Sequence, residues 1–72
     1  MIRGLVHSFP REAPDGALRT FHVREPYVDG TLACSLNGRT LTEGWRVTGW
    51  LAVELDEAPQ ADDVVSFFYQ QV

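Results

Sequence analysis

The sequence has no lysine, one cysteine and two histidines, and each shortage excludes a class of structure or function. Cys34 is the single cysteine among 72 residues, so no disulfide can form within the chain. His7 and His22 have no cysteine pair or carboxylate cluster at ligand spacing, so we expect no metal and no cofactor. Without these stabilising links, a domain of this size is expected to gain stability from self-association or from a partner.

Positive charge is also scarce. Six arginines stand against ten Asp and Glu residues, for a formal net charge of −4, and the arginines are spread along the chain. Phosphate binding needs clustered Lys and Arg, so we expect no nucleic-acid partner. No apolar run approaches the length of a membrane span, and the first ten residues lack a signal-peptide pattern. We therefore expect no membrane partner and synthesis in the cytoplasm.

Turn-forming residues divide the rest of the chain into short segments. Gly, Pro, Asn and Asp recur every few residues, and they leave apolar runs too short for helices but long enough for strands. The sequence therefore predicts an all-β fold, a small antiparallel β-sandwich or barrel of about six or seven short strands. We expect one domain over 1–72, with a strand and loop over 1–19 and a β module over 20–70. The expected strands are 5–9, 20–25, 31–36, 39–42, 45–47, 50–55 and 64–70.

The strongest local signal is the hairpin turn at Asn37 and Gly38. A two-residue type I′ turn needs positive φ at both central positions, which Asn and Gly tolerate best. A second tight turn is expected at Thr48-Gly49. Near the C-terminus, Asp62-Asp63 could instead cap a helix that begins at Val64, but the β-branched and aromatic residues that follow favour a strand.

Alternation in the two last expected strands leaves large apolar residues on both faces. The inward positions are Leu51, Val53, Leu55, Val65, Phe67 and Tyr69. Outward apolar residues often anchor protein interfaces, so we predict a contact surface made by Trp50, Ala52, Val64 and Phe68. The alternative is that one sandwich buries both faces, or that a bulge changes the register.

We predict no catalytic residues. Neither His7 nor His22 has a neighbouring residue pattern that would make it a base. Ser35 beside Cys34 invites comparison with a nucleophile site, but Cys34 lies on the inward face, where a thiol behaves as a small hydrophobe with a raised pKa. Five acidic residues near the C-terminus lack the spacing of a calcium-binding loop and are expected to form a solvated acidic rim. They are Glu54, Asp56, Glu57, Asp62 and Asp63.

Several short motifs follow one another in a definite order, namely Phe21-His22-Val23, the segment 27–32, Leu36-Asn37-Gly38, Gly44-Trp45, Val53-Glu54-Leu55, Ala58-Pro59 and Asp63-Val64-Val65. This order of residues, from Phe21 to Tyr69, resembles a recurrent β module of tailed-bacteriophage virion structural proteins. Such modules occur in tail fibres, head fibres and capsid decoration proteins. Asp62-Asp63 departs from the Gly-Asp that often precedes their final strand, and residues 1–19 have no counterpart.

This resemblance implies a virion structural protein without an active site, assembled in the host cytoplasm and located in the virion. It implies a homo-oligomer, association with other virion proteins, or both. One alternative is a carbohydrate-binding module, in which a glycan stacks on Trp45, Trp50, Tyr27 or Tyr69. A small enzyme or a regulatory inhibitor is a further alternative, although no residue pattern points to a particular reaction.

Overall fold

A computed structural model describes residues 5–72 as an all-β fold. Seven strands and no helix are present in this part of the chain, which confirms the expected fold class and rules out the helical alternative near the C-terminus. Residues 1–4 of the expected domain lie outside the described residues. The strands are β1 (Leu5–Ser8), β2 (Thr20–His22), β3 (Ala33–Leu36), β4 (Arg39–Thr40), β5 (Trp45–Gly49), β6 (Ala52–Leu55) and β7 (Val65–Gln70).

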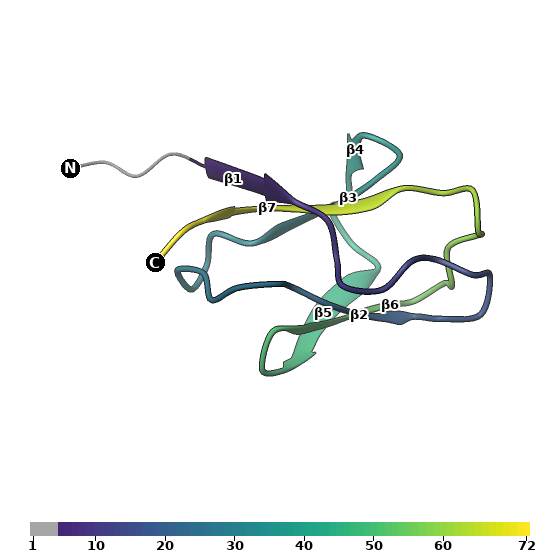
Figure 1. Cartoon of the computed structure of the whole chain (residues 1–72), viewed down its shortest axis with the longest axis horizontal. Helices are drawn as coiled ribbons and strands as arrows, with labels where there is room; N and C mark the ends of the chain where they lie inside the picture. The colour runs from purple at the N-terminus through teal and green to yellow at the C-terminus, as the bar shows by residue number, and fades with distance from the viewer. Residues whose placement is uncertain (1–4) are drawn as a thin grey trace.

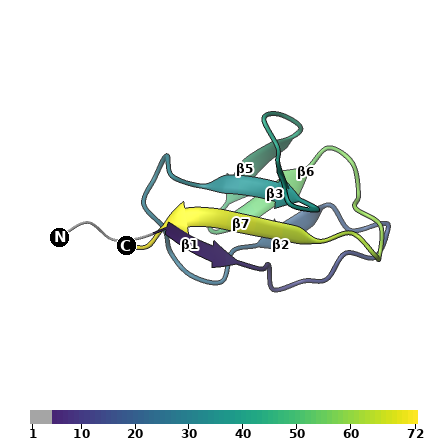
Figure 2. The ribbon, with the colours of Figure 1, turned by 90° about the horizontal axis from the view of Figure 1, so that it is seen from above.

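The strands form two antiparallel sheets that face each other. One sheet has the order β1-β7-β3-β4 and the other the order β2-β6-β5. Figure 1 shows the two sheets edge on, and Figure 2 looks onto β1, β7 and β3 with β2, β6 and β5 behind them. The chain changes sheets between β1 and β2, β2 and β3, β4 and β5, and β6 and β7. Only the β3–β4 and β5–β6 hairpins stay within one sheet.

The core lies between the two sheets, where alternation places it. Phe21 and Val53 are cross-strand partners in the smaller sheet, and Cys34 and Phe67 are partners in the larger one. All four are fully buried. The predicted inward residues of β6 and β7 are confirmed, apart from Leu51, which is half-buried and lies outside β6. The complete buried apolar set is Phe21, Val23, Cys34, Val53, Leu55, Val65, Phe67 and Tyr69.

The predicted turn at Asn37 and Gly38 is confirmed. Both residues have positive φ, 54° and 81°, as a type I′ turn requires. The Asn37 side chain donates from Nδ2 to Asp63 Oδ1 at 3.0 Å and accepts the Val64 N–H at 2.7 Å. The hydrogen bond from Asn37 Nδ2, together with one from the Gln60 N–H, lowers the pKa of the Asp63 carboxyl. The turn therefore also holds the start of β7.

The second predicted turn, at Thr48-Gly49, is wrong. Gly49 pairs with Ala52, so Trp50 and Leu51 form the turn, and a bulge follows Val47. Leu51 has a φ of 58°, a conformation that side chains other than Gly and Asn rarely adopt. Its side chain packs against the core and its carbonyl accepts the Val23 N–H at 2.8 Å, and these contacts offset the cost of the backbone conformation.

Candidate assembly interface

β1 is an edge strand without the features that usually prevent association. It pairs with β7 in an unbroken register from Leu5 opposite Gln70 to Ser8 opposite Phe67. Its other side has no strand partner within residues 5–72. The four residues include no proline and no Asp, Glu, Lys or Arg. Exposed edge strands of this kind are templates for pairing with another chain.

The other three edges of the two sheets are protected. β4 has only two residues. β5 contains Arg46 and a bulge, and both a charge and a bulge discourage strand addition. The edge of β2 is occupied by the β1–β2 connector, because Arg11 N–H donates to His22 O at 3.1 Å and Glu12 Oε1 accepts the His22 N–H at 2.7 Å. Of the four edges, β1 is therefore the best suited to pair with another chain.

The outward face beside this edge is apolar and aromatic. The His7 ring stacks on Phe68, with centroids 4.3 Å apart and planes 3° apart, and the Phe9 ring lies 5.2 Å from His7. Leu5 is 73% exposed and Phe9 is 52% exposed. Val64 continues this surface, since it lines the same hollow as Phe9. We call these five residues, Leu5, His7, Phe9, Val64 and Phe68, the β1 face.

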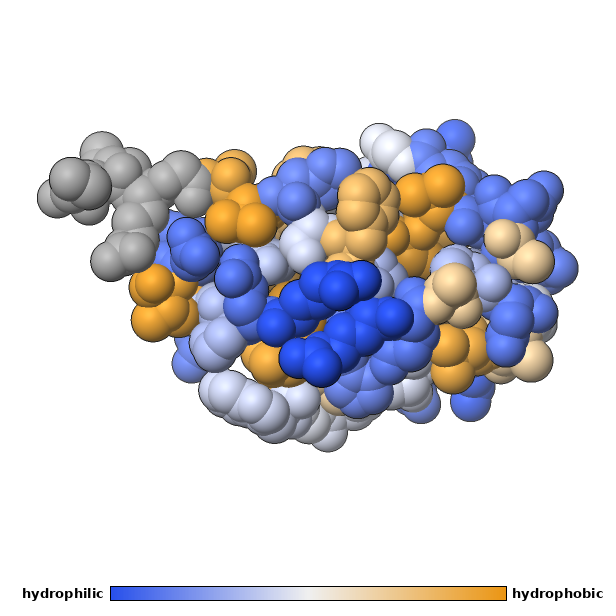
Figure 3. Space-filling view, viewed as in Figure 1, coloured by the Kyte–Doolittle hydropathy of each residue, from blue (hydrophilic) through white to orange (hydrophobic). Residues whose placement is uncertain are grey.

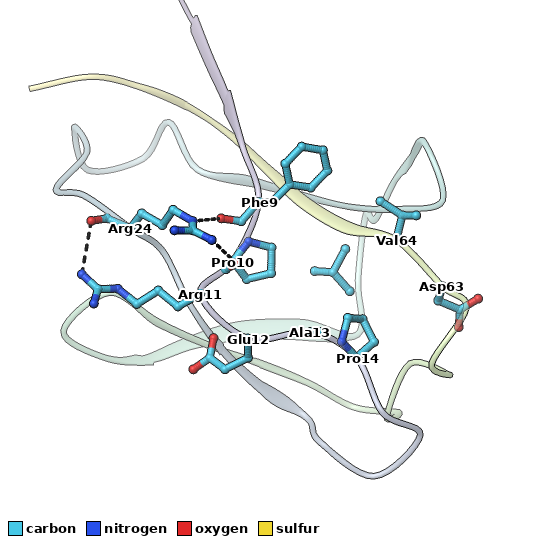
Figure 4. A pocket seen from close by; sticks show the side chains of 10 residues that line it. Phe9, Pro10, Arg11, Glu12, Ala13, Pro14, Arg24, Asp63 and Val64 are labelled. Carbon is cyan, nitrogen blue, oxygen red and sulfur yellow. Dashed lines mark hydrogen bonds between the residues drawn. The ribbon is translucent and has the colours of Figure 1, made fainter.

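The hollow beside the β1 face has a volume of about 310 Å³. Figure 4 shows Phe9, Pro10 and Val64 around it, with Arg24 at its edge. Arg24 donates from Nε to Phe9 O at 3.0 Å and from an Nη group to Pro10 O at 3.3 Å. These two hydrogen bonds of Arg24 fix the course of the chain just after β1.

The face of the molecule seen in Figure 1 is mixed in polarity. Figure 3 shows strongly hydrophilic surface in the middle of this face, bordered by apolar surface.

The structure separates the four residues predicted as an interface. Val64 and Phe68 belong to the β1 face, and Val64 is 50% exposed. Trp50 and Ala52 lie in the hairpin of the other sheet, so the four residues do not form one surface. The sequence analysis did not single out Leu5, His7 or Phe9 for the contact surface, and the structure places them on the β1 face. Leu5, His7 and Phe9 are alternate residues of segment 5–9 and point away from the side that Val6 occupies. This period of two could have placed them on one outward face.

The structure places the side chains that the sequence analysis considered for nucleophile, metal and ion-pair chemistry. Ser35 is buried, and its Oγ has no hydrogen-bond partner within residues 5–72. No three His, Cys, Asp or Glu side chains in residues 5–72 are grouped to hold a metal ion. Arg46 forms ion pairs with Glu54 and, at 2.6 Å, with Asp56 of its own chain. Part of the acidic rim is therefore neutralised within the protomer.

His22 and Glu12 form the one close histidine–carboxylate pair in residues 5–72. Glu12 contacts both the Nδ1 and the backbone N–H of His22. Burial raises the pKa of the Glu12 carboxyl, but the hydrogen bonds from His22 outweigh it and lower the pKa overall. The pair fixes the orientation of the imidazole.

The same described residues include no helix that could cross a membrane.

The Cys34 thiol is expected to be unreactive in the folded protein. It is fully buried, and burial raises its pKa to about 11, so the nucleophilic thiolate is scarce at pH 8. Labelling with a chromogenic disulfide reagent at pH 8 should be slow for the native chain and complete in concentrated urea. Rapid stoichiometric labelling of the native chain would contradict the inward placement of Cys34.

Comparisons of the chain with family models, with curated proteins and with solved structures found no match. No family is therefore assigned.

Proposed function

We propose that the protein is a noncatalytic structural module that self-associates by pairing β1 of one copy with β1 of another. The observation that carries this proposal is that three of the four sheet edges are protected against strand pairing and the β1 edge is not. β4 is very short, β5 has a charge and a bulge, and β2 is covered, whereas β1 is an uncharged four-residue edge next to exposed apolar side chains.

A two-fold axis perpendicular to the sheet gives a favourable register for this pairing. Val6 faces inward, because its partner Tyr69 is buried, whereas Leu5 and His7 face outward. Centring the axis on Val6 sets Val6 opposite Val6 and Leu5 opposite His7 in both halves, so every residue keeps its face. No like charges meet, and the same surface of each copy is used, as an isologous interface requires.

The size of the molecule supports a role in association. Its accessible surface is 4775 Å², against about 4,500 Å² expected for a monomer of this mass. The protomer therefore buries no more surface than a domain of its size usually does, and such domains are marginally stable. Pairing of four-residue strands gives a small interface and closes at a dimer, so we propose that attachment of many dimers to a larger symmetric assembly multiplies the weak contacts.

The assembly that we propose is a bacteriophage particle, in which the protein is a capsid decoration, head-fibre or tail-associated component. Support for this step comes from the order of residues between Phe21 and Tyr69, and the all-β fold is compatible with it. Mass spectrometry of purified virions from a phage that encodes the chain should detect it as a stoichiometric component. Its absence from purified virions would overturn the virion role but not the self-association.

Sedimentation velocity across a wide range of concentrations tests the self-association. The full chain should shift from monomer towards twice the monomer mass as its concentration rises. The double variant Leu5→Lys/His7→Lys places like charges opposite each other at two symmetric positions. It should weaken the dimer by about tenfold or more while circular dichroism remains that of a β fold.

Thr48→Lys is the matched control, because it adds a charge to an exposed position on the protected β5 edge. This variant should dimerise like the unchanged chain. A chain that remains monomeric at millimolar concentration would overturn the proposal. So would loss of dimerisation in Thr48→Lys with no loss in the double variant.

A further inference from the structure

Trp50 is the most exposed large apolar residue among those described, with 79% of its surface accessible. It is held at the tip of the β5–β6 hairpin, next to Leu51, whose side chain is anchored on the core. The Leu51 carbonyl accepts the Val23 N–H, so the turn is fixed to the chain just after β2. Trp50 is therefore an indole displayed on an anchored turn, which favours binding without a large ordering cost.

The two tryptophans differ in how their indole N–H groups are used. Trp45 is half-buried and donates from Nε1 to Leu41 O at 3.1 Å. The Trp50 indole makes no hydrogen bond within residues 5–72, so both its ring face and its donor are available. Of the tyrosines considered for sugar stacking, Tyr69 is fully buried and cannot contact a ligand. The structure thus leaves Trp50 as the best exposed aromatic platform.

A hollow of about 320 Å³ adjoins Trp50, and Arg11 and His22 provide its polar side chains. Arg11 forms no ion pair with any carboxylate in residues 5–72, and its only side-chain hydrogen bond there is to Arg24 O at 3.4 Å. Glu12 occupies the Nδ1 side of His22, and no hydrogen bond in the same residues uses Nε2. The hollow therefore combines an apolar ring, an unneutralised guanidinium and an oriented imidazole.

We propose that this hollow binds a carboxylate-bearing pyranose, such as a uronic or sialic acid residue of a glycan. The apolar C–H face of the sugar would pack on the Trp50 ring. Its carboxylate would accept hydrogen bonds from the Arg11 guanidinium, whose planar fork matches a carboxylate, and a hydroxyl would bond to His22 Nε2. The volume is at the lower end for ligand sites, which fits a single sugar ring.

The charge of the hollow argues for a monoanionic ligand rather than a cation or a nucleotide. A cation would stack on Trp50 only against repulsion from Arg11. A phosphate with two negative charges would approach a chain of net charge −4 unfavourably. The proposed site lies between the β5–β6 turn and the β1–β2 connector and includes none of the five residues of the β1 face, so it does not depend on self-association.

Titration of the ¹⁵N-labelled full chain, followed by NMR, tests this site. The probes are sodium galacturonate, N-acetylneuraminic acid, neutral galactose and uridine monophosphate. At least one acidic sugar should shift the Trp50 indole N–H and Arg11 Nε–H signals saturably. It should bind about tenfold more tightly than galactose, because one charge-assisted bidentate contact is added.

Two variants separate the roles of the side chains. Arg11→Gln keeps the backbone N–H that bonds to His22 and should lower the affinity for the acidic sugar to that for galactose. Trp50→Ala should abolish saturable binding of galactose and of the acidic sugar. It should leave the urea midpoint unchanged, because Trp50 is exposed. Arg39→Gln, an exposed arginine of β4, is the control and should bind the acidic sugar like the unchanged chain.

Three results would overturn the proposal. The first is equal affinity for galactose and both acidic sugars. The second is unchanged binding after Trp50→Ala. The third is tighter binding of uridine monophosphate than of either acidic sugar, which would assign the hollow to a nucleotide.

Discussion

Replacing Phe67 with alanine is expected to remove most of the stability of the fold. Phe67 is fully buried in β7, one of the two inner strands of the larger sheet, between Ser8 of β1 and Cys34 of β3. Truncating a buried phenylalanine costs about 3 to 5 kcal/mol, whereas a chain of this length has about 4 to 11 kcal/mol in total. Urea unfolding followed by circular dichroism should therefore show a greatly lowered midpoint, or no folded baseline.

Phe68→Ala is the matched control for this experiment. Phe68 is the next residue of β7, but it faces outward, is half-buried and stacks on His7. Loss of one aromatic stacking contact is worth about 0.5 to 1.5 kcal/mol, plus a smaller loss of burial. Both variants should be compared at the same protein concentration, since dimerisation raises apparent stability. Equal destabilisation by the two changes would contradict the assignment of inward and outward faces in β7.

Gly38→Ala is expected to destabilise the chain by about 1 to 2 kcal/mol, because an added Cβ disfavours the left-handed conformation. Gly38 has a φ of 81° in the β3–β4 turn, and an added Cβ would meet no atom within 4 Å. The cost is therefore one of backbone conformation, without a clash. A lower urea midpoint with an unchanged slope would show it.

Gly49→Ala provides the comparison within the other hairpin. Gly49 does not have positive φ, and an added Cβ would lie 3.9 Å from the Ala52 Cβ, an ordinary contact. Alanine also restricts the unfolded chain, which adds about 0.4 to 1 kcal/mol of stability where the native conformation is compatible. The midpoint should stay the same or rise. A loss as large as that of Gly38→Ala would show that turn conformation is not the cause.

The sequence predicted those elements whose structure depends on local chemistry. Asn37 and Gly38 both suit positive φ, so the β3–β4 turn follows from two residues. The segment 64–70 alternates without Pro or Gly, and its inward side chains became the core of β7. In both places the local preference and the tertiary contacts favour the same conformation, which is why sequence reasoning succeeded.

The β5–β6 turn could not be predicted because tertiary contacts override a local preference there. Thr48-Gly49 has the better turn residues, yet the structure turns at Trp50 and Leu51. The position of Leu51 is determined by its contacts with the core and by its bond from Val23, neither of which is visible in the sequence around residue 50.

The candidate interface depended on strand order, which the sequence does not specify. Alternation identifies the outward side of each strand, but it does not show which strands share a sheet. Trp50 is exposed and Phe68 is half-buried, but Trp50 lies in the hairpin of the smaller sheet and Phe68 in the larger sheet. The sequence also gave no sign that the β1–β2 connector covers β2 and leaves β1 as the free edge.

The chain order of the strands has a consequence for how the protein is made. β7 lies between β1 and β3, and it carries three of the eight buried apolar side chains, Val65, Phe67 and Tyr69. While a ribosome is still translating this segment, β1 has no neighbour and the core side of the smaller sheet faces water. A stable nascent fold therefore cannot form until β7 has emerged from the exit tunnel, and until then the apolar side chains of the core are exposed and prone to aggregation.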